Sequence, residues 1–125
     1  MSKAGTQCGV ELISIVMNFV NEDAVTPVKE IGLPNVKLLY DIYHMGIMTG
    51  NLSVFIEQNI EWIGHFHSAG IPGRHELFNG ETNYPFIMEK IETAGYQGYF
   101  GLEYKPLLPS QETLVKTLDY LSGGK

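Results

Sequence analysis

Apolar positions alternate along the chain between short, nearly continuous runs and longer stretches with helical spacing. The short runs are rich in β-branched and aromatic residues, as buried strands are, and they cover residues 10–17, 36–43, 62–67 and 98–104. The longer stretches carry residues typical of helix ends and cover residues 22–31, 51–60, 83–95 and 110–121. Pro27 kinks the first of these helices or confines it to a short piece that begins there. Loops are expected at residues 45–50 and 70–82.

This order predicts an α/β fold with four strand–helix units in a single domain, residues 1–125. Helix-length connections between apolar strands are typical of a parallel sheet covered by helices. Four such units are half of a (β/α)8 barrel, which typically needs about 250 residues. The pattern therefore predicts a parallel (βα)4 half of a TIM barrel. An open four-stranded parallel sheet is the alternative, which the pattern alone does not separate from it.

Composition narrows the classes of function. Eight basic and fourteen acidic residues give a net charge of −6, and no Lys/Arg cluster is present, so partners such as nucleic acid or an anionic membrane are not expected. The single cysteine, Cys8, excludes an internal disulfide and fits a reducing compartment. The sequence has no signal-peptide pattern and no apolar run of membrane-spanning length. We expect a soluble, cytoplasmic protein.

Three of the predicted strands end in side chains that ligate metals. With period-two alternation, Asp41, His67 and Glu103 project from the face opposite the helices, near the carboxyl ends of their strands. Parallel α/β folds place their chemistry at that edge. Two carboxylates and an imidazole suit Mn²⁺, Mg²⁺, Co²⁺ or Zn²⁺. Taken singly, an Asp such as Asp41 is more often a turn or cap residue, and a His such as His67 is more often a hydrogen-bonded interior histidine, than a ligand. Glu103 is also explained as a solvated strand end.

Two other residues lie near these strand ends in the sequence. His44 follows Asp41 by three residues and is a candidate for hydrogen bonding to a substrate. Arg74 lies in the long loop after His67 and is a candidate clamp for hydroxyl or phosphate groups. An ordinary loop histidine and a surface arginine are the alternatives. The glycines of this loop follow no phosphate-loop pattern, so no nucleotide site is predicted.

Four longer motifs carry a resemblance to a known family. They read NVKLLYDIYH at residues 35–44, GHFHSAGIPGRHE at 64–76, GETNYP at 80–85 and GYQGYFGLEYKP at 95–106. In order and spacing they resemble the hydroxypyruvate isomerase family, within the xylose isomerase-like TIM barrels. The resemblance covers roughly residues 28–122 and corresponds to the C-terminal half of such a barrel only.

The resemblance implies a site and an activity. One weakly bound divalent metal, Mg²⁺, Mn²⁺ or similar, would be held by Asp41, His67 and Glu103. Glu103 would also act as a catalytic acid or base, and His44 and Arg74 would contact the substrate. The implied reaction is a metal-dependent aldose–ketose isomerisation or epimerisation of a small hydroxy-carbonyl or sugar substrate, by proton transfer through an enediolate.

Two departures from the family pattern qualify that implication. The first four strands of the barrel have no counterpart, and the run at residues 12–18 lacks the carboxylate that the family carries on its fifth strand. The active site is therefore expected to be incomplete, and an open half-barrel is expected to close as a homodimer. The alternative function is a non-catalytic half-barrel that oligomerises and binds metal or a small sugar. Cleavage of abasic DNA is a more distant alternative, because the chain is acidic.

Overall fold

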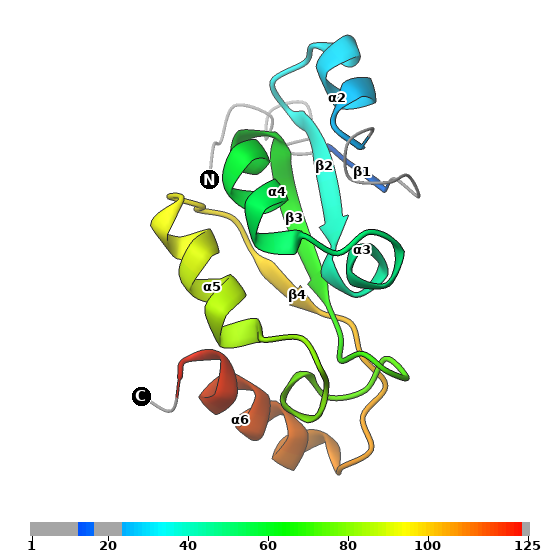
Figure 1. Ribbon diagram of the computed structural model, residues 1–125, viewed down its shortest axis with the longest axis vertical. Coiled ribbons are helices and arrows are strands. Elements are labelled where there is room, and N and C mark those ends of the chain that lie inside the picture. The colour runs from blue at the N-terminus through cyan, green and yellow to red at the C-terminus, as the bar shows by residue number, and fades with distance from the viewer. Residues whose placement is uncertain (1–12, 17–23, 124–125) are drawn as a thin grey trace, which may run out of the picture.

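A four-stranded parallel sheet forms the centre of the computed structural model, which describes residues 13–16 and 24–123 (Figure 1). Its strands are β1 (Ile13–Val16), β2 (Val36–Asp41), β3 (Ile63–Ser68) and β4 (Phe100–Leu102). They pair in sequential order, β1-β2-β3-β4, and every pairing is parallel. All four carboxyl ends therefore meet at one edge of the sheet, as the sequence predicts.

Five α-helices and two short 3-10 helices connect and follow these strands in the described part of the chain. The α-helices are α2 (Thr26–Ile31), α3 (Ile42–Met48), α4 (Leu52–Asn59), α5 (Tyr84–Thr93) and α6 (Ser110–Leu121). The 3-10 helices are η2 (Ile60–Trp62) and η3 (Leu77–Asn79). α2 is short and has Pro27 in its first turn, which agrees with the effect expected of this proline.

Three local expectations were wrong. Residues 42–48 form α3 instead of a strand end and a loop, because the Asp41 carboxylate accepts a hydrogen bond from the backbone N–H of His44 and caps a helix there. β4 has three residues, fewer than the expected 98–104. Serine favours the N-cap position, so Ser110 is the N-cap expected for the last helix, but Pro109 occupies that position in α6.

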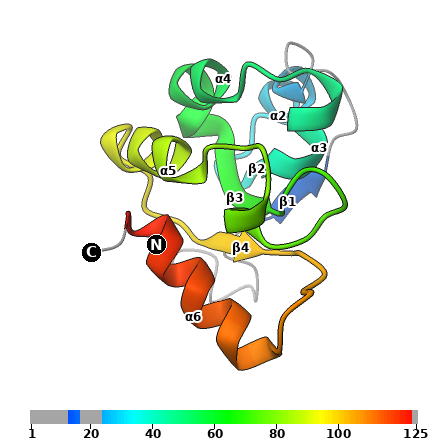
Figure 2. The ribbon, with the colours of Figure 1, turned by 60° about the horizontal axis from the view of Figure 1, so that its bottom comes forward.

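The helix-covered face of the sheet holds the hydrophobic core. Leu38, Tyr40 and Phe66 alternate onto this face and are at most 1% exposed. The Tyr40 ring stacks on Phe55 of α4 with 5.0 Å between centroids. Residues of α2, α3, α4 and α5 belong to the same buried cluster. In Figure 2 these four helices lie on one side of the strands, and α6 lies beyond β4.

The opposite face of the sheet is polar and partly open. Lys37, His65 and His67 on this face are only partly buried, whereas Leu38, Tyr40 and Phe66 on the covered face are buried. A doubly wound open sheet has helices on both faces and a reversal of strand order. Sequential order with one covered face instead is the arrangement of part of a (β/α)8 barrel. No helix among the described residues has the length and apolarity of a membrane span.

Candidate metal centre

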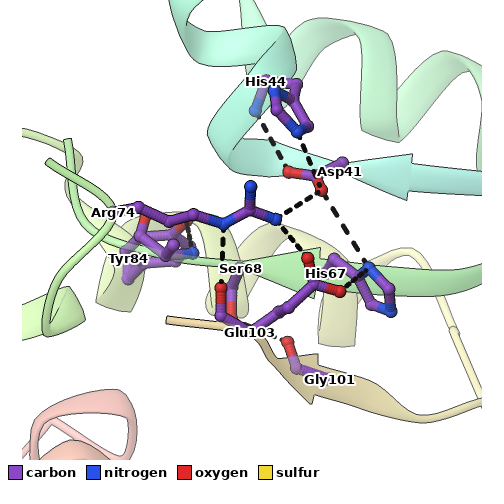
Figure 3. Close-up of polar contacts among 9 residues, drawn as sticks. Asp41, His44, His67, Ser68, Arg74, Tyr84, Gly101 and Glu103 are labelled. Carbon is purple, nitrogen blue, oxygen red and sulfur yellow. Dashed lines mark hydrogen bonds and ion pairs between the residues drawn. The ribbon is translucent and has the colours of Figure 1, made fainter. Parts of the chain in front are cut away.

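Strand register brings the three predicted ligands to one place. Asp41 on β2 is the register partner of His67 on β3, and His67 is the partner of Gly101 on β4. Glu103 lies two residues beyond Gly101, where its backbone N–H donates to the carbonyl oxygen of Ser68 at 2.9 Å. Figure 3 shows the three side chains turned toward one another from these strand ends.

Potential ligand atoms of Asp41, His67 and Glu103 all lie within 4.8 Å of one another. The His67 Nδ1 atom is 2.8 Å from Glu103 Oε2 and 4.0 Å from Asp41 Oδ2. Carboxylate oxygens and an imidazole nitrogen at this spacing form a donor set that fits one divalent cation, with positions left for water or substrate oxygens. Within the described part of the chain this is the one cluster of its kind.

Asp41 serves the local structure and the site at once. Its Oδ1 atom accepts a hydrogen bond from the backbone N–H of His44 at 3.1 Å, which caps α3. Its Oδ2 atom faces the cluster and lies 3.8 Å from His44 Nε2. The residue is 8% exposed. The capping role and the ligand role considered for Asp41 are therefore compatible, because each uses a different carboxylate oxygen.

Arg74 reaches into the cluster from the loop after β3. Its guanidinium contacts the Glu103 carboxylate and lies 3.9 Å from Asp41 Oδ2, and its Nε–H donates to the Glu103 carbonyl oxygen at 3.3 Å. The Tyr43 ring lies 5.2 Å from the guanidinium carbon, in cation–π range. Arg74 is thus no isolated surface arginine. Sequence reasoning missed Tyr43, although it directly precedes His44 in the recognised motif.

His44 stands at the rim of the cluster. Its side chain is 44% exposed, and its ring packs edge-on against Tyr43 with 5.3 Å between centroids. The imidazole is therefore accessible from solvent and close to Asp41. All five residues singled out from the sequence therefore gather at one edge of the sheet (Figure 3).

Gly101 and His65 lie behind the cluster. A Cβ atom at Gly101 would stand 2.9 Å from His65 Nε2 and 3.0 Å from the Phe66 carbonyl oxygen, so a larger residue there would have to displace the His65 ring and press on the backbone of β3. Burial, and secondarily electrostatic repulsion from the neighbouring His67 ring, lower the pKa of His65. His65 therefore favours the neutral form and adds no charge next to the ligands.

Buried polar contacts hold the end of β3. The Tyr84 hydroxyl donates to the carbonyl oxygen of Ala69 at 2.8 Å and accepts from its N–H at 3.1 Å. Burial raises the pKa of Tyr84, which keeps the hydroxyl protonated. The Ser68 hydroxyl donates to the Gly101 carbonyl oxygen at 2.8 Å and ties β3 to β4. None of these residues stood out in the sequence, because their partners are distant along the chain.

On the side of the cluster toward β1, the structure describes residues only as far as Val16. The last described residue of β1, Val16, is the register partner of Leu39, two residues before Asp41. Residues 17–23, which include Glu22 and Asp23, lie outside the described part of the chain. Three ligands from β2, β3 and the end of β4 are therefore described.

Sequence comparison places the fold and these motifs in one family. The model of the xylose isomerase-like TIM barrel family matches residues 2–122. The chain belongs to this family. The half-barrel fold derived above is the corresponding part of that architecture.

Similar proteins include isomerases of small carbonyl compounds. The chain is 41% identical over 85 residues to 2-oxo-tetronate isomerase of Cupriavidus necator, which covers 68% of this chain and 33% of that protein. It is 41% identical over 83 residues to hydroxypyruvate isomerase of Escherichia coli, covering 66% of this chain and 32% of that protein. The chain thus spans about a third of the length of these curated relatives.

A solved structure supports the same placement. The crystal structure of an AP endonuclease, family 2, from Brucella melitensis superimposes with a TM-score of 0.74 at 37% identity. The match covers 80% of this chain and 39% of that one. The partial coverage agrees with a chain that holds part of a barrel.

Proposed function

We propose that this chain is a divalent-metal-dependent isomerase or epimerase unit acting on a small hydroxy-carbonyl or sugar substrate. Asp41, His67 and Glu103 hold the cation, and Glu103 also transfers the proton. The observation that carries the proposal is the convergence of their donor atoms within 4.8 Å from three neighbouring strand ends. The activities named for the relatives, isomerisation of hydroxypyruvate and of 2-oxo-tetronate, support the substrate class.

Each residue has a distinct part in this proposal. A bound divalent cation supplies a Lewis acid for the carbonyl and hydroxyl oxygens of the substrate. The Glu103 side chain is 48% exposed, so a substrate that displaces its contact with Arg74 or His67 can reach the carboxylate and give it a proton from an adjacent carbon. Arg74, oriented by the Tyr43 ring, and His44 at the rim bind substrate oxygens.

The proposed reaction needs a second acid or base, and the run at residues 12–18 offers no carboxylate. A positioned acid or base contributes roughly 10²–10⁴-fold to rate. We therefore expect the 125-residue chain to bind Mn²⁺ and substrate but to turn over slowly by itself. The alternative function, a half-barrel that binds metal or sugar without catalysis, predicts no turnover above the uncatalysed rate.

An assay with hydroxypyruvate and tartronate semialdehyde separates these functions. The purified chain is compared with Glu103→Gln and with Glu89→Gln, which removes a carboxylate from an exposed position on α5 and serves as the matched control. Slow turnover that requires Mn²⁺ or Mg²⁺, and that Glu103→Gln abolishes while Glu89→Gln does not, supports the enzyme. No metal-dependent interconversion in any variant would leave only the binding function.

We further propose that the protein closes its half-barrel as a homodimer, because both edges of the described sheet carry unmatched surface. α6 buries Thr113 and Thr117, whereas Leu114 and Leu118 are 47% and 62% exposed. β1 and β4 each pair with one neighbour in the described sheet, and Leu33, between α2 and β2, is 56% exposed. Covering several hundred Å² of apolar surface at about 25 cal/mol per Å² contributes on the order of 10 kcal/mol. A two-fold axis brings the β4 edge of one copy to the β1 edge of the other.

Light scattering at micromolar concentration tests the dimer. We expect twice the chain mass of 14.0 kDa for the parent, and a monomer for Leu118→Lys. Val54→Lys, at an exposed position on α4 away from both edges, is the matched control and should remain a dimer. A stable parent monomer would contradict this proposal without bearing on the metal site.

A further inference from the structure

Glu76 is a buried acid that the site described above does not use. It lies in the loop between β3 and α5, is 1% exposed, and forms no ion pair with any residue in the described ranges. Its Oε2 atom accepts hydrogen bonds from the backbone N–H groups of Leu107 and Leu108, at 2.8 and 3.0 Å, and from the Thr113 hydroxyl at 3.0 Å. Burial acts to raise the pKa of Glu76, but these hydrogen bonds, together with one from its own backbone, outweigh it and lower the pKa overall.

The partners of Glu76 belong to the segment that carries Glu103. β4 ends at Leu102, and residues 103–108 run on beside Ser68, the last residue of β3, and the loop at residues 69–76. Backbone bonds join the two: the Glu103 N–H donates to the Ser68 carbonyl oxygen at 2.9 Å, and the Lys105 N–H donates to the Arg74 carbonyl oxygen at 2.7 Å. Farther along the same segment, the Glu76 carboxylate accepts hydrogen bonds from the backbone N–H groups of Leu107 and Leu108. These are the last contacts in the series that joins the two segments.

A second connection runs from Glu76 to the residue after Glu103. The Tyr104 hydroxyl lies 3.0 Å from Thr113 Oγ1, the same atom that donates to Glu76, and 3.2 Å from Thr117 Oγ1. The buried carboxylate therefore holds the N-terminal turn of α6 and, through Thr113, the side chain adjacent to Glu103. Charge-assisted hydrogen bonds of this kind are stronger than neutral ones and fix geometry accordingly.

We propose that Glu76 is a positioning residue for the cluster: it fixes residues 103–108 against the loop of Arg74 and thereby holds the Glu103 carboxylate within reach of His67. Glu76 contacts neither the cation nor the substrate in this proposal, and its effect on metal affinity rests on the proposed function. Arg74 and Glu103 are on the two segments that Glu76 joins. Loss of the carboxylate loosens their relative position while the hydrophobic core stays intact.

Glu76→Ala and Glu76→Gln test the inference, with Ile91→Ala as the matched control. The glutamine side chain is isosteric with glutamate and retains an uncharged acceptor oxygen. Glu76→Gln should therefore still hold residues 103–108 in part. Ile91 is a 2% exposed core residue of α5, and its truncation destabilises the chain without removing any described hydrogen bond to residues 68–76 or 103–108. Where the alanine variant fails to fold, the glutamine variant carries the comparison.

The first measurement is Mn²⁺ affinity by calorimetry, well below the melting temperature of every variant. Residues that orient metal ligands typically contribute about 10–100-fold to affinity, so we expect at least a tenfold loss for Glu76→Ala and a smaller loss for Glu76→Gln. Ile91→Ala should match the parent. Loss of stability with unchanged Mn²⁺ affinity in both Glu76 variants would overturn the inference.

The second measurement needs no metal. Amide hydrogen exchange at Glu103 and Lys105 should accelerate by about tenfold or more in Glu76→Ala relative to the amide of Phe66 in the same chain. In Ile91→Ala that ratio should stay at the parent value. A parent chain that binds no Mn²⁺ refutes the proposed function, and this exchange ratio then decides the role of Glu76 independently. An unchanged ratio in Glu76→Ala refutes that role.

Discussion

The two faces of the sheet are built differently, although they share the same strands. On the covered face, Leu38, Tyr40 and Phe66 are at most 1% exposed and pack against four helices. On the open face, the His67 side chain is 26% exposed, and the nearby Glu103 side chain is 48% exposed. Polar contacts connect the open face to the segments that follow the strands, whereas apolar packing holds the covered face.

This difference separates stability from chemistry. Burial of large apolar side chains is the main favourable term in folding, and the covered face supplies it. Partly exposed ionisable groups on the open face contribute little to stability, but they are accessible to a cation and to a substrate. Substitutions on the covered face should therefore change the free energy of unfolding, whereas substitutions on the open face should mainly change metal binding.

The largest expected effect is on the covered face. Phe66 is fully buried and packs edge-on against Tyr96, with 4.9 Å between ring centroids. Phe66→Ala should lower the free energy of unfolding by about 3–5 kcal/mol, because it removes a large side chain from a packed core. Urea denaturation measures this loss. The neighbouring open-face variant His67→Ala should lose less than half as much, and equal losses would contradict the division between the faces.

Asp41 contributes both to stability, as the N-cap of α3, and to the proposed metal site, so its variants can separate the two contributions. Asp41→Asn retains an oxygen that caps α3 but loses the charge, whereas Asp41→Ala loses both. We expect Asp41→Ala to be about 1 kcal/mol less stable than Asp41→Asn, the usual contribution of an N-cap. Both should weaken Mn²⁺ binding markedly, since each removes a charged ligand. Thermal unfolding and calorimetry separate the two roles, and parent-like Mn²⁺ affinity in Asp41→Asn would remove Asp41 from the ligand set.

The smallest effect concerns acid stability. The pKa of Glu76 is lower in the folded protein than its ordinary value of 4.5. Its charged form therefore stabilises the fold above about pH 4.5, and this contribution is lost as the pH falls below that value toward the folded pKa. The difference in unfolding free energy between the parent and Glu76→Gln should be constant near neutral pH and shrink in acid. A difference that stays constant down to about pH 3 would show that the carboxylate titrates normally.

Much of this arrangement follows from the sequence because it depends on periodicity. Parallel strands that end in Asp41, His67 and Glu103 must bring these residues to the same edge, whatever the loops do. The motif around Arg74 is part of the resemblance that indicated the family. The strand order confirms the predicted half-barrel.

Other features could not be predicted, because they depend on contacts between distant segments or on a local competition. The apolar run through Ile42 fits a strand as well as a helix, and the Asp41 cap decides for α3. Glu76 contacts residues 31 to 37 positions away, so no local pattern indicates its role. Tyr43 likewise gains its significance only from the position of Arg74.

Anomalous diffraction from a crystal grown with Mn²⁺ tests the central claim most directly. The account predicts one Mn²⁺ peak per chain within about 2.0–2.3 Å of an Asp41 oxygen, the His67 Nδ1 atom and a Glu103 oxygen. A crystal of Asp41→Asn grown in the same way should show a weaker peak or none at this position. A Mn²⁺ peak elsewhere on the protein, with the contacts of Glu103 to Arg74 and His67 unchanged in saturating Mn²⁺, would contradict the assignment of these three residues as a metal centre.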